Sequence, residues 1–366
     1  MIQPDPDRLS TAWTRTLAVG YERVARPGLF TADPEVIHER MITTLERTPA
    51  VVNRALRAAV AGERCPVEVA GIAFDGRVGL AAGLDKDGRA AASWAGFGFG
   101  FAELGTVTPV AQPGNDRPRL FRLPESKAII NRMGFNNSGS PALASRLRRR
   151  GVRRGNRALG LPLGVSIGKN KVTPNERATD DYRAALADVV DVADYVAINV
   201  SSPNTPGLRS LQAGRDLEAL VSAVVQAAGQ HDPLHPVPIF VKVAPDLEPD
   251  DLAVSVRAAE VGGAAALIAT NTTLARDGVA EADRAVTAEA GGLSGAPLST
   301  RALQVVERVV GLTDLPVVGV GGLMTADDTR RMFAAGATLV QVYTGFIYSG
   351  PALVRAANRV SREANA

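Results

Sequence analysis

Short apolar runs rich in Val, Ile and Ala alternate with longer helical patterns from Val78 to the end of the chain. Runs that are apolar throughout are typical of parallel strands buried on both faces. About eight strand–helix units in series predict an α/β fold, a closed (β/α)₈ TIM barrel, rather than an open doubly wound sheet. The runs are Val78–Ala82, Phe99–Leu104, Leu163–Ile167, Tyr195–Val200, Ile239–Val243, Ala265–Thr270, Val317–Val320 and Leu339–Tyr343. A helical pattern follows each run, as in Ala178–Val192, Gly214–Ala228, Pro249–Val261 and Ala326–Ala335.

Composition excludes several classes of protein. The 366 residues are 46% hydrophobic and 22% charged, which describes a soluble globular chain with ample core. The single cysteine, Cys65, excludes an intramolecular disulfide and a cysteine-rich zinc site. A net charge of +3 is too small to predict a nucleic-acid partner. Asp5, Asp7 and Arg8 stand where a signal peptide needs an apolar core, so we expect no export.

Each apolar run ends in a polar cluster, and this position predicts where the site lies. Barrel enzymes build their sites from the loops after the carboxyl ends of the strands. All of these loops carry polar residues here, so we expect a large ligand surface. The clusters are AGLDKDG, GTVTP, GKNKVTP, NVSSPNTPG, KVAPD, TNTT, GVGG and YTGF.

Three segments lie outside the repeat. Val67–Val78 alternates and contains Asp75-Gly76, which predicts a β-hairpin closing the barrel floor. Ala111–Asn137 is a long insertion, and we expect it to be a lid or a wall of the site. Residues 1–64 form a helical extension, which leaves residues 65–366 as the barrel domain.

The extension carries apolar residues at helical spacing, and Asp33-Pro34-Glu35 is a plausible helix start. Helices packed on the barrel are the plainer interpretation of such a stripe. Nine Arg against eight Asp or Glu in residues 1–64 do not make a cationic membrane-binding face. The spaced residues are Trp13, Leu17, Val24, Leu29, Phe30, Ile37, Met41 and Leu45.

Glycines close the seventh and eighth strands. Backbone amides at Gly319–Gly322 and at Tyr343–Gly345 predict the phosphate cradle that is usual in this fold. The alternative is that these glycines serve only tight turns.

Lys86 and Lys242 stand at the ends of the first and fifth strands, inside the predicted barrel mouth. A buried cation needs an anionic partner. That partner is a substrate carboxylate, a phosphate, a reduced flavin ring or, in a purely structural role, Asp85 or Asp246.

Asparagine amides both donate and accept hydrogen bonds, so a set of them suits a ligand dense in carbonyl and N–H groups, such as a pyrimidine or a flavin. The same mouth holds Asn131, Asn136, Asn137, Asn170, Asn199, Asn204 and Asn271. One asparagine at a strand end is ordinary turn chemistry, but seven on one face predict ligand binding.

The segment Val196–Gly207, VAINVSSPNTPG, ends a buried strand in a loop shaped by Pro203 and Pro206. It contains no His, Cys, Asp or Glu, so chemistry here starts from a serine hydroxyl or from a cofactor. His231 and His235 do not offer a metal pair, because Pro233 and Pro236 break the helix that would align them.

In this order the clusters resemble the dihydroorotate dehydrogenase family. The resemblance rests on AAGLDKDG, GTVTPVAQPGNDRPRLFRL, NRMGFNN, IGKNK, NVSSPNTPGLRSLQ, VKVAPDL, ATNTT, GGLSGAPL, GVGGL and LVQVYTGF, and it covers nearly all of the chain from Val78. It points to the class 2, quinone-reducing branch, which has serine where class 1 has cysteine and which adds a helical N-terminal extension.

The resemblance implies FMN as cofactor, dihydroorotate as substrate and a place in pyrimidine synthesis. FMN is then held by Ala82, Gly83, Leu84, Asp85, Lys86, Thr106, Asn170, Asn199, Lys242 and Thr270, and its phosphate by Gly295, Gly322, Tyr343 and Thr344. Dihydroorotate is held by Lys86, Asn131, Arg132, Met133, Gly134, Phe135, Asn199, Asn204, Asn271 and Thr272.

It further implies that Ser202 takes the C5 proton while hydride passes from C6 to the flavin. His38, Arg119 and Tyr343 match positions at the inner end of a quinone tunnel. The extension then docks on the cytoplasmic side of the cell membrane as a peripheral anchor, and we expect a monomer that binds no nucleic acid.

Three other functions compete with this interpretation. The first is a soluble flavin barrel that uses fumarate or a nicotinamide cofactor. The second is a phosphate-binding barrel isomerase or lyase without flavin, which would be colourless. The third is a non-catalytic membrane-docked binding protein, against which Lys86, Ser202 and Lys242 argue.

Overall fold

The computed structural model describes residues 19–60, 64–205, 207–212 and 214–364. Trp13, Leu17 and Pro206, on which parts of the sequence interpretation rest, lie outside these residues.

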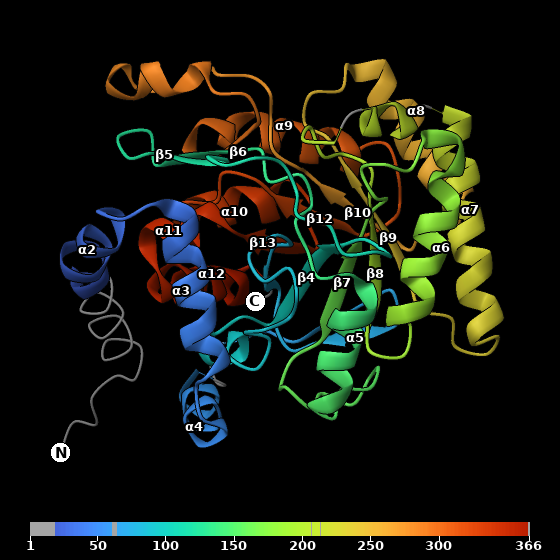
Figure 1. The fold of residues 1–366 in the computed structure, drawn as a ribbon, viewed down its shortest axis with the longest axis horizontal. Coiled ribbons are helices and arrows are strands. Elements are labelled where there is room, and N and C mark those ends of the chain that lie inside the picture. The colour runs from blue at the N-terminus through green and yellow to red at the C-terminus, as the bar shows by residue number, and fades with distance from the viewer. Residues whose placement is uncertain (1–18, 61–63, 206, 213, 365–366) are drawn as a thin grey trace.

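Eight parallel strands close into a barrel, as the apolar runs predict (Figure 1). Every neighbouring pair is parallel, and the last strand pairs with the first through Val340–Val78 and Val342–Leu80. All eight predicted runs are strands, and the closed TIM barrel is confirmed. The strands are β3 (Val78–Leu80), β4 (Phe101–Val107), β7 (Leu163–Ile167), β8 (Tyr195–Asn199), β9 (Ile239–Val243), β10 (Ala266–Ala269), β12 (Val317–Val320) and β13 (Leu339–Val342).

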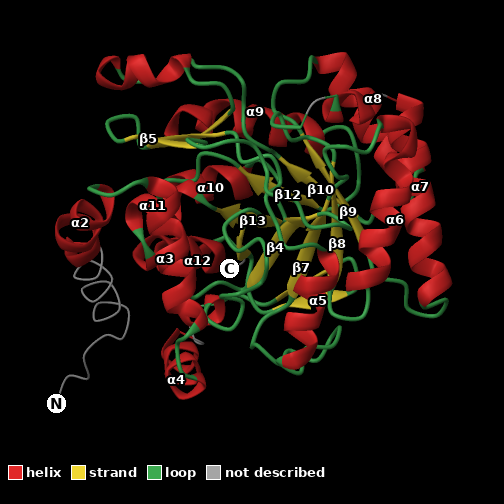
Figure 2. Ribbon diagram, viewed as in Figure 1, coloured by secondary structure: helices red, strands yellow, loops and turns green. Residues whose placement is uncertain are grey.

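Helices enclose the strands, as Figure 2 shows in red around yellow. They are α5 (Ser140–Arg149), α6 (Ala178–Val189), α7 (Gly214–His231), α8 (Pro249–Val261), α9 (Ser299–Val310), α10 (Ala326–Ala334) and α12 (Pro351–Glu363). The expectation of a helix after every strand is wrong for the first unit, where the short 3₁₀ helix η3 (Trp94–Phe97) follows β3. Glycines at 88, 96 and 98 make a longer helix costly in this segment.

Large aromatic rings fill the barrel interior because glycines stand opposite them. A Cβ on Gly79 would lie 2.3 Å from the Phe101 ring, and one on Gly164 would lie 2.1 Å from the Tyr195 ring. Tyr195 stacks on Phe240 with ring centroids 4.3 Å apart. These layers leave no open pore, so a ligand must bind at the mouth.

A hairpin of β1 (Val67–Val69) and β2 (Ile72–Phe74) closes the floor of the barrel, as predicted. Phe74 meets Phe101 edge to face at 5.0 Å. The turn lies at Ala70-Gly71, with φ of 52° and 74°, rather than at the expected Asp75-Gly76. Two consecutive left-handed residues are what a two-residue hairpin turn requires.

The insertion forms a small antiparallel sheet beside the barrel mouth. Its strands β5 (Leu120–Leu123) and β6 (Ala128–Asn131) pair with each other, and β6 also pairs with β11 (Gly292–Gly295) from the loop after β10. Leu123, Ile130 and Leu293 bury their side chains in a separate apolar cluster. The sheet is therefore a fixed wall. Short helices η4 (Asn175–Arg177), η5 (Leu208–Gln212), η6 (Glu281–Ala288), η7 (Ala296–Leu298) and α11 (Thr344–Ser349) complete the loops.

The N-terminal extension runs along one flank of the barrel as η1 (Tyr21–Ala25), α2 (Arg26–Phe30), α3 (Pro34–Glu46) and α4 (Ala50–Val60) (Figure 1). Asp33 caps α3 by accepting from the backbone amides of Glu35 and Val36, which confirms the predicted start. Helix α4 packs against η3, where the first unit lacks an outer helix. Val24 and Met41, expected on an apolar face, are exposed.

Candidate active site

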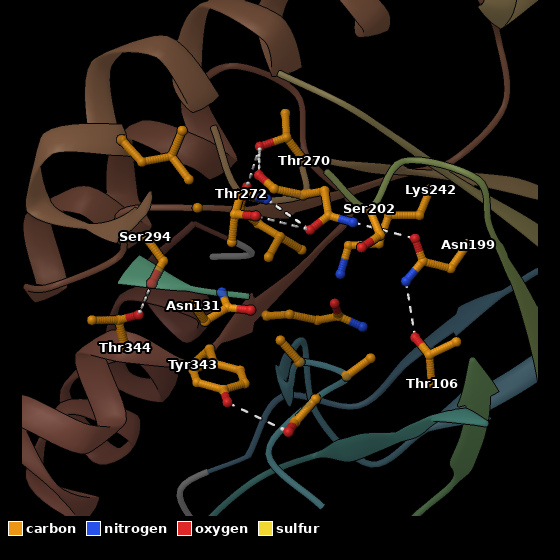
Figure 3. Close-up of a pocket in the computed structure, with 18 of the residues that line it drawn as sticks. Thr106, Asn131, Asn199, Ser202, Lys242, Thr270, Thr272, Ser294, Tyr343 and Thr344 are labelled. Atoms are coloured by element: carbon orange, nitrogen blue, oxygen red, sulfur yellow. Dashed lines mark hydrogen bonds between the residues drawn. The ribbon is translucent and has the colours of Figure 1, made fainter. Parts of the chain in front are cut away.

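A cleft opens at the carboxyl ends of the barrel strands (Figure 3). The space within it, open mouth included, is about 990 Å³. Seven of the eight strand-end clusters and the insertion contribute to its lining. The insertion supplies Asn131 and Met133–Phe135, and so forms the expected wall.

Ser202 lies in this cleft, three residues beyond the end of β8, and is 6% exposed. Its Oγ accepts a hydrogen bond of 3.3 Å from the backbone amide of Asn204. Within the described residues this is the only hydrogen bond of that hydroxyl. The oxygen is thus fixed by its own loop and faces the cleft without a histidine or carboxylate partner.

Two pairs of asparagines fix one another around this serine. Asn199 donates to Thr106 Oγ1 at 2.9 Å, and Asn271 donates to Asn199 Oδ1 at 3.2 Å and to Ser201 Oγ at 3.0 Å. Each of these bonds sets which end of an amide is carbonyl and which is NH₂. Across the cleft, Asn204 Nδ2 donates to Asn131 Oδ1 at 3.1 Å. The site therefore presents oriented donors and acceptors to a planar heterocycle.

The expectation that seven asparagines share one face is wrong for three of them. Asn170 does not line the cleft, because its amide is used on the backbone carbonyl of Val110 at 2.8 Å and on nearby side chains. Asn137 donates to the Phe135 carbonyl at 2.7 Å and supports the insertion. Asn136 lines a second, smaller cavity.

Two lysines reach the cleft from opposite sides. Lys242, on β9, is buried, and burial lowers its pKa while the charge of Glu103 opposes that shift. Burial, reinforced by the Arg119 charge, lowers the pKa of Lys86 to about 8. The suggested structural partners are engaged elsewhere: Asp85 accepts from Trp94 and from the amides of residues 89 and 90, and Asp246 binds Arg209. Within the described chain neither ammonium lies within ion-pair distance of a carboxylate, so both favour an anionic ligand.

Ser294 and Thr344 lie at the end of the cleft opposite Lys242 (Figure 3), and neighbouring glycines shape this end. Gly295 and Gly322 have φ of 98° and 68°, and a Cβ on either would lie 2.3 Å from neighbouring backbone. Thr344 donates to Ser294 Oγ at 2.8 Å across this end. Small residues bring backbone amides and two hydroxyls close to one point, which is the chemistry a phosphate group needs.

The two ends together fit a flavin mononucleotide. Oriented amides and a buried ammonium lie at one end, the glycine cradle lies at the other, and Ala81, Val320 and Tyr343 supply apolar walls between them. Thr106 and Thr270 add hydroxyls, so most of the predicted cofactor residues share one cleft.

A second cavity lies between α3 and the loop after β3. His38 lines it, and burial together with the Lys86 charge lowers the pKa of this imidazole to about 3. Lys86 lines both cavities. Leu84 and Asp85, predicted to touch the cofactor, line the second cavity and not the first. Burial raises the pKa of Asp85 to about 6, with the bond from Trp94 opposing the shift.

Three more predicted site residues, Tyr343, Arg119 and Arg132, lie in different places. Tyr343 lines the main cleft, and burial raises its pKa to about 12. Arg119 lines neither cavity and is buried against Glu35. Arg132 turns outward to Glu289 at 2.5 Å. The predicted quinone residues are therefore distributed between the two cavities and the packing around α3.

Three polar residues near the cleft were missed. Ser294 and Gln341 line it, and Glu103 lies fully buried in the barrel, where it accepts from Gln341 Nε2 at 2.8 Å and Tyr195 Oη at 3.1 Å. The signal in the sequence is a polar residue inside an otherwise apolar strand, as in FAELG and LVQVY.

No group of His, Cys, Asp or Glu in the described part of the chain is arranged to hold a metal ion. None of the helices described has the length and apolar character needed to cross a membrane.

Comparison with known proteins agrees with this geometry. The sequence model of the family described as Dihydroorotate dehydrogenase matches residues 65–363. A curated "Dihydroorotate dehydrogenase (quinone)" of Salinispora arenicola is 53% identical over 93% of this chain and 99% of its own length. The protein of that name from Chloroflexus aurantiacus is 48% identical over 94% of this chain and 97% of its own length. The crystal structure of DHODH from Eimeria tenella in complex with ferulenol superposes with a TM-score of 0.79 and 37% identity, covering 90% of both chains.

Proposed function

The chain belongs to the dihydroorotate dehydrogenase family, and we propose that Ser202 is the group that takes the proton from its substrate. The protein is an oxidoreductase of pyrimidine biosynthesis that oxidises dihydroorotate to orotate with a quinone as electron acceptor. A soluble enzyme that uses fumarate or a nicotinamide cofactor is not favoured, since the relatives carry the quinone designation.

The cleft would hold FMN along its length. Lys242, Asn199, Thr106 and Thr270 would bind the ring, and Gly295, Gly322 and Thr344 would bind the phosphate. When bound, FMN supplies the two-electron acceptor that dihydroorotate oxidation needs and that no side chain of the cleft offers. The positive charge of Lys242 would stabilise negative charge that develops beside it.

Dihydroorotate would lie between the ring and the wall formed by the insertion. Lys86 would pair with the substrate carboxylate, and Asn131, Asn204 and Asn271 would bind the pyrimidine edge. Their mutual hydrogen bonds fix these amides before the substrate arrives, so little ordering cost remains on binding.

Ser202 would act by placement more than by intrinsic basicity. A serine hydroxyl is a weak base, and this one has no histidine to activate it. As it accepts the C5 proton, its own proton must pass on to water or a neighbouring hydroxyl. The amide of Asn204 holds the oxygen at 3.3 Å and leaves it directed at the cleft.

The observation that carries this assignment is a fixed hydroxyl inside a cleft of oriented amides and two cations. Ser202→Ala should keep its FMN and its yellow colour, while anaerobic bleaching of the flavin by dihydroorotate slows by about 10²- to 10⁴-fold. Ser210→Ala is the matched control, because Ser210 lies on η5, just after the loop that carries Ser202, and donates to the Gly207 carbonyl away from the cleft. Near-normal bleaching in Ser202→Ala would remove the assignment. Reoxidation by quinone, and not by fumarate or NAD, tests the acceptor.

We further propose that residues 1–64 form a quinone-binding and membrane-docking extension of the catalytic domain, residues 65–366. The extension contains seven of the 14 exposed large hydrophobic side chains of the described chain, including Val51, Val52 and Leu56 on α4. The protein would bind peripherally, as a monomer, to the cytoplasmic side of the membrane, and His38, Arg119 and Tyr343 would lie near the inner end of the quinone path.

Val51→Glu/Leu56→Glu tests membrane docking by co-sedimentation with neutral lipid vesicles. Val254→Glu is the control, because Val254 lies on α8, away from the extension, and its exposure of 51% falls between those of Leu56 (44%) and Val51 (68%). The double variant should lose vesicle binding and retain dihydroorotate-driven bleaching. Equal binding of all three proteins would contradict the proposed docking surface.

A further inference from the structure

Three loops that follow neighbouring strands meet at one arginine outside the cleft. Arg209 lies on η5, directly after the loop that carries Ser202. Its Nε donates to the Ser201 carbonyl at 3.1 Å, its Nη2 to the Thr272 carbonyl at 3.1 Å, and its Nη1 to Asp246 Oδ2 at 2.9 Å. These partners belong to the loops after β8, β10 and β9 respectively.

The planar guanidinium makes this contact rigid. Its N–H groups lie in a fixed fork, so three acceptors on three loops are held at set positions relative to one another. A lysine carries a single ammonium on a flexible chain and cannot reproduce the fork.

Asp246 in turn holds the arginine. Besides Arg209, its carboxylate accepts from the Thr273 hydroxyl and from the Leu274 amide at 2.9 Å, while Arg301 lies 3.6 Å away. The side chains of Arg209 and Asp246 are 23% and 17% exposed, so the pair is largely shielded from water. The carboxylate is therefore bonded to the loop after β10, and it orients the guanidinium toward the carbonyls of Ser201 and Thr272.

These contacts fix the backbone immediately before Ser202. Arg209 fixes the Ser201 carbonyl from outside the cleft, while Asn271 donates to Ser201 Oγ from inside at 3.0 Å. With residue 201 held on both sides, the backbone of Ser202 has little freedom, and the Asn204 amide fixes its hydroxyl. Displacement of a reacting group by about 1 Å can cost a hundredfold in rate.

We propose that Arg209 and Asp246 are positioning residues that hold Ser202 at the distance needed for proton abstraction from the substrate. The inference rests on the proposed role of Ser202 as proton acceptor. Neither residue lines the cleft, so both act through the loop and not by contact with the ligand.

The test uses the holoenzyme with Arg209→Lys and, separately, Asp246→Asn, which keeps a hydrogen-bond acceptor. Anaerobic flavin reduction by dihydroorotate should slow by about 10- to 100-fold. Reoxidation of the reduced enzyme by quinone should stay within twofold, and so should the dissociation constant of orotate, since Lys86 and the amides are untouched. Arg257→Lys is the control, because it alters an exposed Arg–Glu260 pair on α8 that touches no loop of the site.

Two readouts separate positioning from a merely structural role. The deuterium isotope effect from C5 of dihydroorotate should rise in Arg209→Lys while that from C6 does not, because only proton transfer is misplaced. Amide hydrogen exchange within residues 199–205 should increase in the variant without a change elsewhere in the barrel.

A double variant distinguishes the failure of this inference from the failure of the proposed function. If Arg209 acts through Ser202, Ser202→Ala/Arg209→Lys reduces its flavin no more slowly than Ser202→Ala alone. An unchanged rate in Arg209→Lys, an additive double variant, or loss of FMN in both single variants would each overturn the positioning role while leaving Ser202 in place. Fast flavin reduction in Ser202→Ala itself would overturn both.

Discussion

Arg119 binds both carboxylate oxygens of Glu35, with Nη2 2.7 Å from Oε1, and this pair joins helix α3 of the extension to the insertion just before strand β5. Its other amino group donates to the carbonyls of Pro113 and Asn115 at 2.6 and 2.7 Å. Both charged side chains are less than a tenth exposed. Because a buried ion pair becomes costly when one partner is removed, the contact fixes where α3 lies on the barrel.

Glu35→Gln should therefore loosen the extension. Two arginines, Arg117 and Arg119, lose their counter-charge, and the docked state should lose on the order of 3 kcal/mol. We expect a lower melting temperature and a raised quinone KM, with dihydroorotate-driven flavin bleaching unchanged. Glu281→Gln is the control, since its pair with Arg284 is exposed on both sides and contributes at most about 1 kcal/mol. Slower bleaching would show that Glu35 also serves the cleft.

The Glu35–Arg119 pair makes the packing of α3 on the barrel sensitive to acid. Burial alone would raise the pKa of Glu35, but the hydrogen bonds and charges of Arg119 and Arg117 outweigh it and lower the pKa below 4.5. A carboxyl with a depressed pKa stabilises the folded state above its unfolded pKa, and that contribution is lost as pH falls through the folded pKa. Thermal melting between pH 6 and 3 should show a steeper loss for the wild type than for Glu35→Gln.

Lys86 should make ligand binding weaken in alkaline solution. Its pKa of about 8 means that the ammonium is charged at neutral pH and loses its proton above pH 8. The dissociation constant of orotate, measured through the flavin spectrum, should then rise by up to about tenfold per pH unit above 8. Lys86→Met should bind weakly at every pH with a flat profile, and Lys127→Met, on the exposed insertion turn, should match the wild type. A wild-type profile that stays flat to pH 9 would contradict the assignment.

The barrel could be predicted from the sequence because its physical signal is local. Strands buried on both faces are apolar throughout, and the clusters at their ends must meet at one edge once the strands are parallel. The sequence therefore predicts that Ser202, Lys242 and Asn199 lie in the site. Their convergence follows from the topology alone.

The rest depended on contacts between distant segments. Asn170 follows β7 and Asn137 ends the insertion, but their amides are used on the backbone carbonyls of Val110 and Phe135. No local feature of the sequence indicates the role of Arg209, because the three loops that meet at it are distant from one another in the chain. The hairpin turns at Gly71 and not at Asp75-Gly76, because the pairing of Val69 with Ile72 leaves only two residues between β1 and β2. These features are decided by tertiary contacts, which produce no periodic pattern in the sequence.

His38 should remain neutral under physiological conditions. Burial, aided by the Lys86 charge, lowers its pKa to about 3. Below pH 6.5 this imidazole is therefore protonated in the unfolded chain but stays neutral in the folded protein until the pH nears 3. Folding should thus lose up to about 1.4 kcal/mol per pH unit between 6.5 and 3 through this residue. Urea unfolding of His38→Gln should show a weaker acid dependence, whereas the exposed His231→Gln should behave as the wild type. Identical acid profiles for the wild type and His38→Gln would mean that the imidazole is protonated when folded.

Gly322 should be indispensable for the cofactor. With φ of 68° and a Cβ that would lie 2.3 Å from Ser299 Cα, an alanine here must displace backbone at the glycine end of the cleft. Gly322→Ala should therefore purify with little FMN and bind added FMN at least tenfold more weakly, as followed by flavin fluorescence. Gly229→Ala is the matched control, because this glycine lies near the end of α7 with nothing within 4 Å of its Cβ position. It should keep full FMN and gain about 0.5 kcal/mol of stability. Full flavin content in Gly322→Ala would mean that the phosphate lies elsewhere in the cleft.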